Sequence, residues 1–320
     1  MSASIGQSIE EAKRHLLEGH LVAVPTETVY GLAANALDGK AVAGIFEAKN
    51  RPQFDPLIVH VSSLENAAEL LEEIPPAAST LAKKFWPGPL TILLPKRPVI
   101  PDLVTAGLGR VGLRNPDHPL TQQLLQALPF PLAAPSANPF GYVSPTTAQH
   151  VNDQLGSKIS YILDGGSCRI GIESTIIGWE NGDAVIYRLG GLSTEVIEEA
   201  IGPVRIQNHS SSRPEAPGQL LRHYAPKKKF FLGDIDTLLH SVKPKNPGIL
   251  SFQKRTVPSP SFHQALSERG DLQEAAKNLF TMLREFDRHN IDCVIAEEVP
   301  NRGLGRAIND RLRRAASPEY

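Results

Sequence analysis

Short apolar runs that alternate with amphipathic stretches constrain the fold of this chain more than any other feature. Five of the runs have the length of buried strands: residues 21–24, 57–61, 90–94, 161–163 and 184–189. Stretches with helical spacing lie between several of them, such as residues 41–49 and the segment that Ser62 and Ser63 open. This alternation favours an α/β or mixed-sheet domain that ends near Gly202.

The sequence changes character between about residue 207 and residue 229. Residues 208–214 are polar and lack periodicity, which predicts an extended linker. Beyond them, residues 230–232, 248–252 and 293–296 look like strands of a smaller α/β unit, and apolar residues between 272 and 286 have helical spacing. The division that we expect is a first domain over 1–205, a linker over 206–228 and a Rossmann-like α/β domain over 229–320.

Composition narrows the class of protein. The chain has 33 basic and 34 acidic residues, so it has no overall bias toward nucleic acid or membrane surfaces. Cys168 and Cys293 lack the paired spacing of a metal site or a disulfide framework, which fits a reduced compartment. No apolar run approaches transmembrane length, and residues 8–11 (Ser-Ile-Glu-Glu) predict a capped helix instead of a signal peptide. We expect a soluble cytoplasmic protein.

Polar groups that suit a ligand follow the first predicted strand. Residues 25–31 read Pro-Thr-Glu-Thr-Val-Tyr-Gly, so Thr28 would stand near the carboxyl end of a strand, where ligands collect in open α/β sheets. An ordinary strand-to-turn segment would explain the same residues equally well. His60 and Arg114 interrupt or end other apolar runs, and a lone His beside a strand is more often structural than catalytic.

A pair of cations stands at the end of the predicted helix 41–49. Lys49 and Arg51 flank Asn50, and Pro52 follows them. A single cation at this place commonly complements the helix dipole. Two cations beside a proline-bounded loop could equally clamp a triphosphate, because Arg supplies a planar fork and Lys a point charge.

Hydroxyl, amide and guanidinium groups recur in the second half of the first domain. Ser136 and Asn138 follow an apolar stretch, and Ser144 opens a predicted helix start, which suits a phosphate but also suits plain turn and cap residues. Ser174 places a hydroxyl in a predicted buried strand, where a backbone group or a ligand must satisfy it. Arg188 also lies in a predicted strand, and an internal Arg snorkels, pairs or faces a ligand.

One apparent motif is discarded because of its context. Residues 107–112 match the Gly-x-Gly-x-x-Gly dinucleotide fingerprint by letter. Residues 111–116, however, look like a strand that ends at a proline, and the fingerprint requires a helix there. The sequence also has no Walker-type lysine loop, so an ATP site in this chain would have to be built differently.

The order of the short motifs resembles the YrdC-type threonylcarbamoyl-AMP synthases. The shared segments are residues 26–31, 49–52, 56–60, 114–119, 136–138, 144–146, 173–175 and 187–188. Residues 223–226, His-Tyr-Ala-Pro, match the signature of the long form of this family, which has an extra C-terminal domain. The resemblance implies a twisted mixed sheet with a nucleotide cleft in residues 1–205, followed by the smaller C-terminal domain.

The resemblance also implies an activity, that of an L-threonylcarbamoyladenylate synthase, which is a nucleotidyltransferase. L-threonine, bicarbonate and ATP would give threonylcarbamoyl-AMP and pyrophosphate, for the threonylcarbamoyl-adenosine modification of tRNA next to the anticodon. Mg²⁺ would accompany the ATP, although the sequence has no dedicated metal motif. A downstream threonylcarbamoyl-transferase complex would receive the product, no membrane contact is implied, and a weak RNA contact is left open.

Site residues follow from the resemblance position by position. The residues that would contact ATP are Lys49, Arg51, Asp55, Ser136, Ser144, Arg188 and His223. Those that would hold threonine are Thr28, His60, Arg114 and Ser174. Lys49, Arg51, Ser136 and Asn138 would form the catalytic group.

Three positions depart from the pattern of the family. Asp55 stands where Asn is expected, and a carboxylate near a triphosphate is repulsive unless magnesium or a lysine lies between them. Arg110 takes the place of a usual Thr, and Phe140 that of a small residue. These changes could alter nucleotide contacts or the shape of the pocket.

Two other functions remain open from the sequence. The first is an RNA-binding module of the same fold, which the basic cluster 227–229 supports. The second is a carbamoyl-transfer domain. The linker is also interpreted in two ways. We expect its end, residues 222–226, to fold back over the first domain as a lid, and the alternative is a solvated tether.

Overall fold

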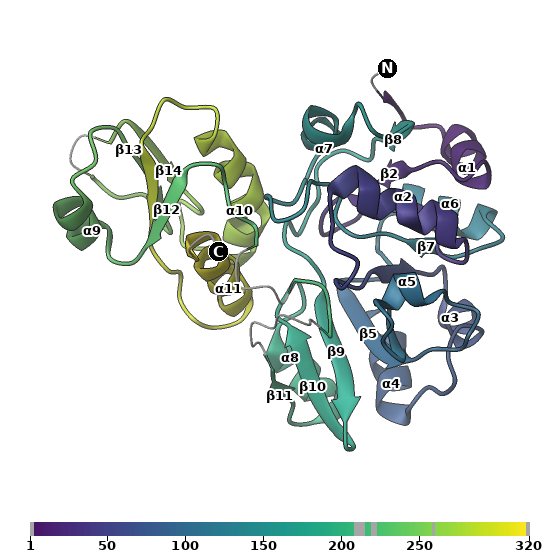
Figure 1. Ribbon diagram of the computed structural model, residues 1–320. Helices are drawn as coiled ribbons and strands as arrows, with labels where there is room; N and C mark the ends of the chain where they lie inside the picture. The colour runs from purple at the N-terminus through teal and green to yellow at the C-terminus, as the bar shows by residue number, and fades with distance from the viewer. Residues whose placement is uncertain (1–2, 208–214, 219–222, 258–259, 318–320) are drawn as a thin grey trace.

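The computed structural model describes residues 3–207, 215–218, 223–257 and 260–317, which form two lobes (Figure 1). The larger lobe is built on a mixed sheet of eleven strands within residues 3–207. In spatial order these are β1 (Ser4–Gly6), β8 (Tyr161–Leu163), β2 (Val22–Val24), β3 (Gly31–Asn35), β7 (Leu132–Ala133), β4 (Ile58–His60), β6 (Arg110–Arg114), β5 (Leu90–Pro95), β9 (Thr175–Glu180), β10 (Asp183–Arg188) and β11 (Arg205–Ile206).

Helices surround this sheet, and their first turns show why they begin where they do. They are α1 (Ile9–Leu17), α2 (Gly39–Lys49), α3 (Leu64–Ala68), α4 (Pro76–Phe85), α5 (Asp102–Thr105), α6 (Pro119–Ala127), α7 (Ala148–Leu155) and α8 (Thr194–Ile201). Ser8 caps α1 by accepting a hydrogen bond from the Glu11 amide, and Thr147 caps α7 in the same way. The predicted helix starts at Ser8 and near Ser144 are therefore confirmed.

The smaller lobe is a four-stranded parallel sheet with helices against it. Its strands, in spatial order, are β12 (Lys229–Leu232), β15 (Cys293–Ala296), β13 (Pro247–Ser251) and β14 (Phe262–Ala265). Its helices are α9 (Ile235–Val242), α10 (Leu272–Phe286) and α11 (Leu304–Ala316). Parallel strands joined through helices give the α/β architecture that the sequence predicts for this part of the chain.

The five apolar runs of the first domain coincide with β2, β4, β5, β8 and β10, so those predictions are confirmed. The predicted helix 41–49 forms most of α2. Residues 110–114 are strand β6, which confirms that the glycine pattern at 107–112 does not open a helix. The predicted linker segment 208–214 lies outside the described residues.

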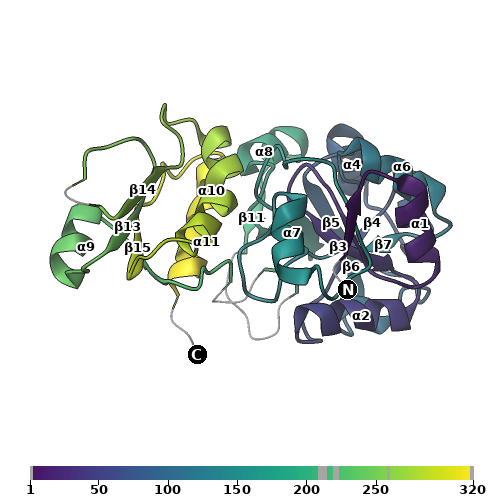
Figure 2. The same ribbon diagram turned by 90° about the horizontal axis from the view of Figure 1, so that it is seen from above.

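The two lobes share part of one hydrophobic core. Helices α10 and α11 lie between the four-stranded sheet and the larger lobe in both views (Figures 1 and 2). Val29, Val143 and Ile172 of the larger lobe belong to the same buried cluster as Phe280 and Leu283 of α10. Because apolar area is removed from water across this boundary, hydrophobic burial holds the lobes together directly.

Candidate active site

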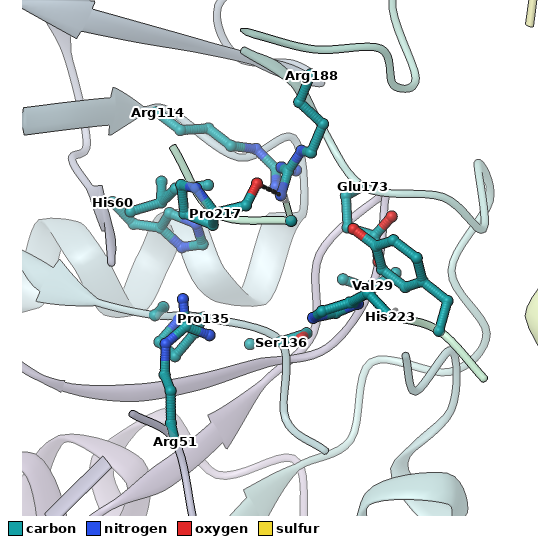
Figure 3. A pocket seen from close by; sticks show the side chains of 15 residues that line it. Val29, Arg51, His60, Arg114, Pro135, Ser136, Glu173, Arg188, Pro217 and His223 are labelled. Carbon is teal, nitrogen blue, oxygen red and sulfur yellow. Dashed lines mark hydrogen bonds between the residues drawn. The ribbon is translucent and has the colours of Figure 1, made fainter. Parts of the chain in front are cut away.

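A polar cleft opens in the larger lobe beside the described part of the linker (Figure 3). It encloses about 530 Å³, counted with the part open to solvent. The residues that line it are Val29, Gly31, Arg51, Ile58, His60, Arg114, Ala134, Pro135, Ser136, Glu173, Arg188, Pro217, Gly218, His223 and Tyr224. Arg51 enters the cleft from the opposite side to Arg114 and Arg188 (Figure 3).

Arg51 is positioned by the way in which α2 ends. Asn50 takes a left-handed conformation with φ of 51°, which stops the helix, and Pro52 prevents its continuation. The Arg51 side chain then donates from Nε to the Asp55 carbonyl at 3.1 Å and from Nη2 to the Pro56 carbonyl at 2.7 Å. Two backbone bonds thus fix the plane of the guanidinium at the cleft wall.

Asp55 lies behind Arg51 instead of facing the cleft. Its Oδ2 is 2.9 Å from Arg51 Nη2 and its side chain is fully buried. Burial raises the pKa of Asp55, and the neighbouring Arg51 opposes that rise. A cation therefore stands beside this carboxylate, which answers the concern that Asp55 would repel a triphosphate. Whether Asp55 contacts ATP stays a prediction.

Lys49 also lies behind the cleft wall. Its Nζ donates to the carbonyls of Ser136 and Asn138, each at 2.5 Å, and the residue is almost entirely buried. Burial, with Arg51 nearby, holds the pKa of Lys49 well below its usual value. The geometry makes Lys49 the support of the turn 136–138, while the predicted contact between Lys49 and ATP is untested.

Arg114 and His60 stand side by side because their strands are in register. His60 of β4 pairs with Arg114 of β6 in a parallel ladder. Arg114 Nη2 lies 2.7 Å from Glu27 Oε2, and Glu27 is buried. Burial, and then the charge of Arg114, hold the pKa of His60 well below its usual value, so the imidazole is neutral near pH 7.

The Arg188 side chain is positioned by hydrogen bonds to Ser174, the residue that precedes β9. Its Nε donates to the Ser174 carbonyl and its Nη2 to Ser174 Oγ, both at 3.0 Å. Ser174 Oγ also lies 2.7 Å from Thr91 Oγ1. The buried Ser174 hydroxyl is therefore satisfied by protein groups, and a ligand is not required to satisfy it.

Glu173 joins the cleft to Ser144. Ser144 Oγ donates to Glu173 Oε1 at 2.6 Å, and Ser144 is fully buried. Thr28 is equally buried, with its Oγ1 2.9 Å from Thr26 Oγ1. Both hydroxyls thus stand one layer behind the lining, and their predicted ligand contacts stay predictions.

The described part of the linker covers one side of the cleft. Pro217, Gly218, His223 and Tyr224 contribute to its lining, and the Arg188 Nη1 donates to the Pro217 carbonyl at 3.3 Å. The ring of Phe140 meets His223 edge-on at 6.0 Å between centroids. Phe140, one of the residues that depart from the family pattern, therefore contacts the linker. Whether these residues act as a lid stays a prediction.

Several buried polar atoms around the cleft accept or donate no hydrogen bond within the described residues. They are Glu27 Oε1, Asp55 Oδ1, His60 Nδ1, Asn138 Oδ1 and His223 Nδ1. Buried polar groups are nearly always paired in proteins, so such a concentration at one place points to a polar ligand.

The predicted site residues thus fall into two layers. The structure brings Arg51, His60, Arg114, Ser136, Arg188 and His223 together at the cleft surface. Six others form the layer behind: Thr28, Lys49, Asp55, Asn138, Ser144 and Ser174. The sequence assigned no ligand role to Glu27 or Glu173, and it placed Tyr224 in the predicted lid, residues 222–226. Glu27 stands between two threonines and Glu173 directly precedes Ser174 and Thr175, so a carboxylate beside hydroxyls was the available signal for the two acids.

Comparison with known proteins decides the family. Residues 14–190 match the profile of the Sua5, YciO and YrdC family, described as telomere recombination, and residues 192–317 match that of the threonylcarbamoyl-AMP synthase C-terminal domain. Threonylcarbamoyl-AMP synthases of Pyrococcus abyssi and Bacillus subtilis are 43% and 40% identical over 98% and 96% of this chain, and 96% and 92% of their own lengths. The crystal structure of P. abyssi Sua5 complexed with L-threonine matches with a TM-score of 0.90 and 41% identity, over 98% of this chain and 97% of that one.

This chain belongs to the threonylcarbamoyl-AMP synthase family.

Membership in this family confirms the predicted family, the α/β fold class and the assignment as an enzyme. It does not favour the RNA-binding module or the carbamoyl-transfer domain, because the relatives over nearly the full length are named as synthases. Among the described residues, no helix has the length and apolar character needed to cross a membrane.

Proposed function

We propose that this protein is an L-threonylcarbamoyladenylate synthase, a nucleotidyltransferase that forms threonylcarbamoyl-AMP and pyrophosphate from L-threonine, bicarbonate and ATP. The observation that carries the proposal is the convergence of Arg51, Arg114 and Arg188 on one cleft in a chain of this family. ATP and bicarbonate are anions at neutral pH, and the threonine zwitterion carries a carboxylate. A site that gathers them needs fixed cations, and three guanidinium groups supply them.

Threonine is assigned to the end of the cleft at Arg114 and His60. Arg114 is held by Glu27, so its guanidinium is oriented before a ligand arrives, which suits a carboxylate. The neutral His60 has an unpartnered Nδ1 among the described residues, which suits the amine or hydroxyl of threonine. The related P. abyssi protein was crystallised with L-threonine, which supports the choice of this amino acid.

The nucleotide is assigned to the side where Arg51, Ser136, Arg188 and His223 lie. In the reaction, the threonine nitrogen bonds to the carbon of bicarbonate with loss of water. An oxygen of the resulting carbamate then attacks the α-phosphorus of ATP, and pyrophosphate leaves with the electron pair of the broken P–O bond. Neither step requires a covalent bond to the protein, so alignment and neutralisation of charge can supply most of the acceleration.

The linker residues at the cleft would protect the product. The mixed anhydride between carbamate and phosphate is sensitive to water, and Pro217, Gly218 and His223 cover the cleft where it would form. Exclusion of water also strengthens the interaction of the guanidinium groups with phosphates. The described linker segments are therefore proposed to act as the lid.

Magnesium is proposed to enter with the triphosphate. The cluster of three potential metal ligands found among the described residues is His15, Glu18 and His20 near the end of α1, which is not part of the cleft lining. The carboxylate at the cleft, Glu173, is engaged by Ser144. This donor set suits an ion held chiefly by phosphate oxygens, with charge neutralisation on ATP as its contribution.

The setting of the reaction follows from its product. An activated threonylcarbamoyl group calls for a transferase that moves it to the adenosine next to the tRNA anticodon, so we propose a threonylcarbamoyl-transferase complex downstream. A reducing compartment such as the cytoplasm is consistent with Cys168 and Cys293, which are buried free thiols.

The test is the release of pyrophosphate by the purified full chain. We expect release to require L-threonine, bicarbonate and Mg·ATP together, and mass spectrometry to find threonylcarbamoyl-AMP in matching amount. Omission of each substrate in turn provides the control. Pyrophosphate release that is unaffected by omission of threonine or of bicarbonate would rule out the proposed reaction.

A further inference from the structure

Helix α11 of the smaller lobe presents an unusual row of buried charges to the larger lobe. Arg311 is fully buried, and Asp310 and Arg314 on the same helix are almost so. Helices α10 and α11 are the elements of this lobe that face the cleft-bearing lobe (Figures 1 and 2). Burial of charge is costly unless each charge is paired. Asp310 pairs with Arg311 and Arg314 on the same helix, and Arg311 has a further partner across the boundary.

The partner of Arg311 is the acidic residue of the cleft. Arg311 Nε and Nη2 each lie 3.1 Å from Glu173 Oε2, in the larger lobe. Its Nη1 donates to the Leu189 carbonyl at 2.7 Å and to Asp310 Oδ2 at 2.9 Å. Three of these four hydrogen bonds tie α11 to Glu173 and to the residue that follows β10.

The other oxygen of the same carboxylate holds a predicted nucleotide-binding residue. Glu173 Oε1 accepts the 2.6 Å hydrogen bond from Ser144 Oγ. The loop of Ser144 is also fixed from the smaller lobe by Arg284 of α10, whose Nε donates to the Ser144 carbonyl at 3.3 Å and whose Nη2 donates to the Val143 carbonyl. Two arginines of the smaller lobe therefore determine where Ser144 lies.

Arg311 also neutralises the negative charge of Glu173 at the cleft. Glu173 lines the cleft, where a triphosphate is proposed to bind, and it acts electrostatically on Arg188. Behind the lining, Arg311 pairs with Glu173 and Asp310, and Arg314 pairs with Asp310, so the two acidic and two basic charges balance. Without Arg311 that balance fails, and Glu173 would compete with the phosphates for Arg188.

Resting on the proposed function, we propose that Arg311 is a positioning residue for ATP that the second lobe contributes to the active site. It holds Glu173 so that this carboxylate orients Ser144, and it neutralises the negative charge that would otherwise repel the nucleotide. The second lobe is then part of the nucleotide site, beyond any role as an anchor for the lid.

Arg311 and its helix also contact the linker. The Arg311 guanidinium lies 5.1 Å from the centre of the Tyr224 ring, a cation–π distance, and Tyr224 lines the cleft. The backbone amide of His223 donates to the carbonyl of Arg314, on the next turn of the face that carries Arg311. The contacts of α11 thus reach the cleft both through Glu173 and through the lid.

The test replaces the charge of Arg311 and then removes the charge that it neutralises. In Arg311→Met, which keeps the length of the side chain, we expect the Kd of Mg·ATP to rise about tenfold or more, while the Kd of L-threonine changes less than about twofold. In the double variant Arg311→Met/Glu173→Gln, the neutral amide should recover most of the lost ATP affinity. A purely structural role for Arg311 would not be rescued by loss of its partner's charge.

Controls separate the possible failures. Arg313→Met changes an exposed arginine of the same helix that pairs with Glu298, and we expect wild-type affinity. Thermal unfolding checks the fold of each variant. If Arg311→Met does not fold, Arg311→Lys, which keeps the charge without the fork, should raise the Kd of Mg·ATP measurably but by less than about tenfold.

Binding is measured apart from turnover, so failure of the proposed reaction in the wild-type chain would leave this test intact. Unchanged ATP affinity in a folded Arg311→Met variant, or a double variant no better than the single one, would overturn the proposal.

Discussion

Arg51 illustrates how much of the site depends on single side chains. Its guanidinium makes two backbone hydrogen bonds and still lines the cleft, which a lysine could not reproduce because it lacks the planar fork. For Arg51→Lys we expect the KM of ATP to rise about tenfold, with the Kd of threonine within about twofold of wild type. Steady-state pyrophosphate release and calorimetry measure the two quantities. Equal loss for both substrates would contradict the assignment of Arg51 to the nucleotide.

Lys49 is expected to behave differently from Arg51, although only Asn50 lies between them in the sequence. Lys49→Met would leave the Asn138 carbonyl without its Lys49 donor, at a cost of about 1–3 kcal/mol for a buried group, and would leave the Ser136 carbonyl with the Asn138 amide as its donor. We therefore expect a lower thermal midpoint and weaker binding of both substrates. A variant that loses ATP binding alone, at unchanged stability, would restore Lys49 to direct contact with the nucleotide.

His60 gives the protein a defined pH dependence. Its pKa in the folded chain is well below the usual value, so the unfolded chain takes up the proton first as pH falls. The stability contributed by the neutral imidazole is present above about pH 6.5 and is lost progressively below it. Denaturant unfolding between pH 7.5 and 5 should show this decline, and His60→Gln, which cannot titrate, should decline less. Identical slopes for the two proteins would contradict it.

At the scale of elements, the linker is fastened to the large sheet by a residue that departs from the family pattern. Arg110 of β6 donates from Nη2 to Glu215 at 2.6 Å and from Nη1 to the Tyr187 hydroxyl at 2.9 Å. The sequence suggested that Arg110 could alter nucleotide contacts, but the structure places it against the segment that carries Pro217 and Gly218. Arg110 therefore fastens the segment that we propose as the lid.

Arg110→Thr, which restores the residue usual in the family, should loosen that attachment. We expect the KM of ATP to rise about twofold to fivefold, since an ion pair that is partly exposed contributes modestly. Hydrolysis of threonylcarbamoyl-AMP during turnover should increase as well. Arg205→Thr is the matched control, because Arg205 forms an exposed ion pair with Glu180 on the same sheet. If both variants behave alike, Arg110 does not secure the lid.

Whether an element could be predicted depends on whether neighbouring residues or distant segments of the chain determine it. Strands such as β2, β4 and β5 are continuous apolar runs, so local periodicity was enough to find them. The two-residue strands β7 and β11 have no local signature, because their pairing with β3, β4 and β10 is decided by distant segments. The same limit applies to the site. Motif order indicated Arg51, Arg114 and Arg188, whereas the ion pair between Glu173 and Arg311 joins residues 138 positions apart.

At the scale of the whole molecule, the question is whether the chain connection or the shared core holds the lobes together. Val29 and Ile172 of the larger lobe pack in one buried cluster with Phe280 and Leu312 of the smaller lobe. Arg284 and Arg311 add charged contacts across the same boundary. Such a boundary resembles an obligate interface, in which hydrophobic burial is supplemented by paired charges, more than two independent domains on a tether.

A cut in the linker distinguishes the two arrangements. A protease site inserted among residues 208–214, outside the described residues, would leave residues 215–218 and 223–224 attached to the smaller lobe. We expect the cut halves to elute together in gel filtration and to keep ATP affinity within about threefold of the intact chain, because the contacts across the boundary do not depend on the severed bond. Cleavage of the double variant Arg311→Met/Arg284→Met should release the halves more readily. The Glu173 carboxylate and the carbonyls that Arg284 binds would then lose their arginine partners at the boundary. Halves that separate at once from the cut wild-type chain, with ATP affinity unchanged, would show that the larger lobe binds the nucleotide alone and that the smaller lobe is only tethered to it.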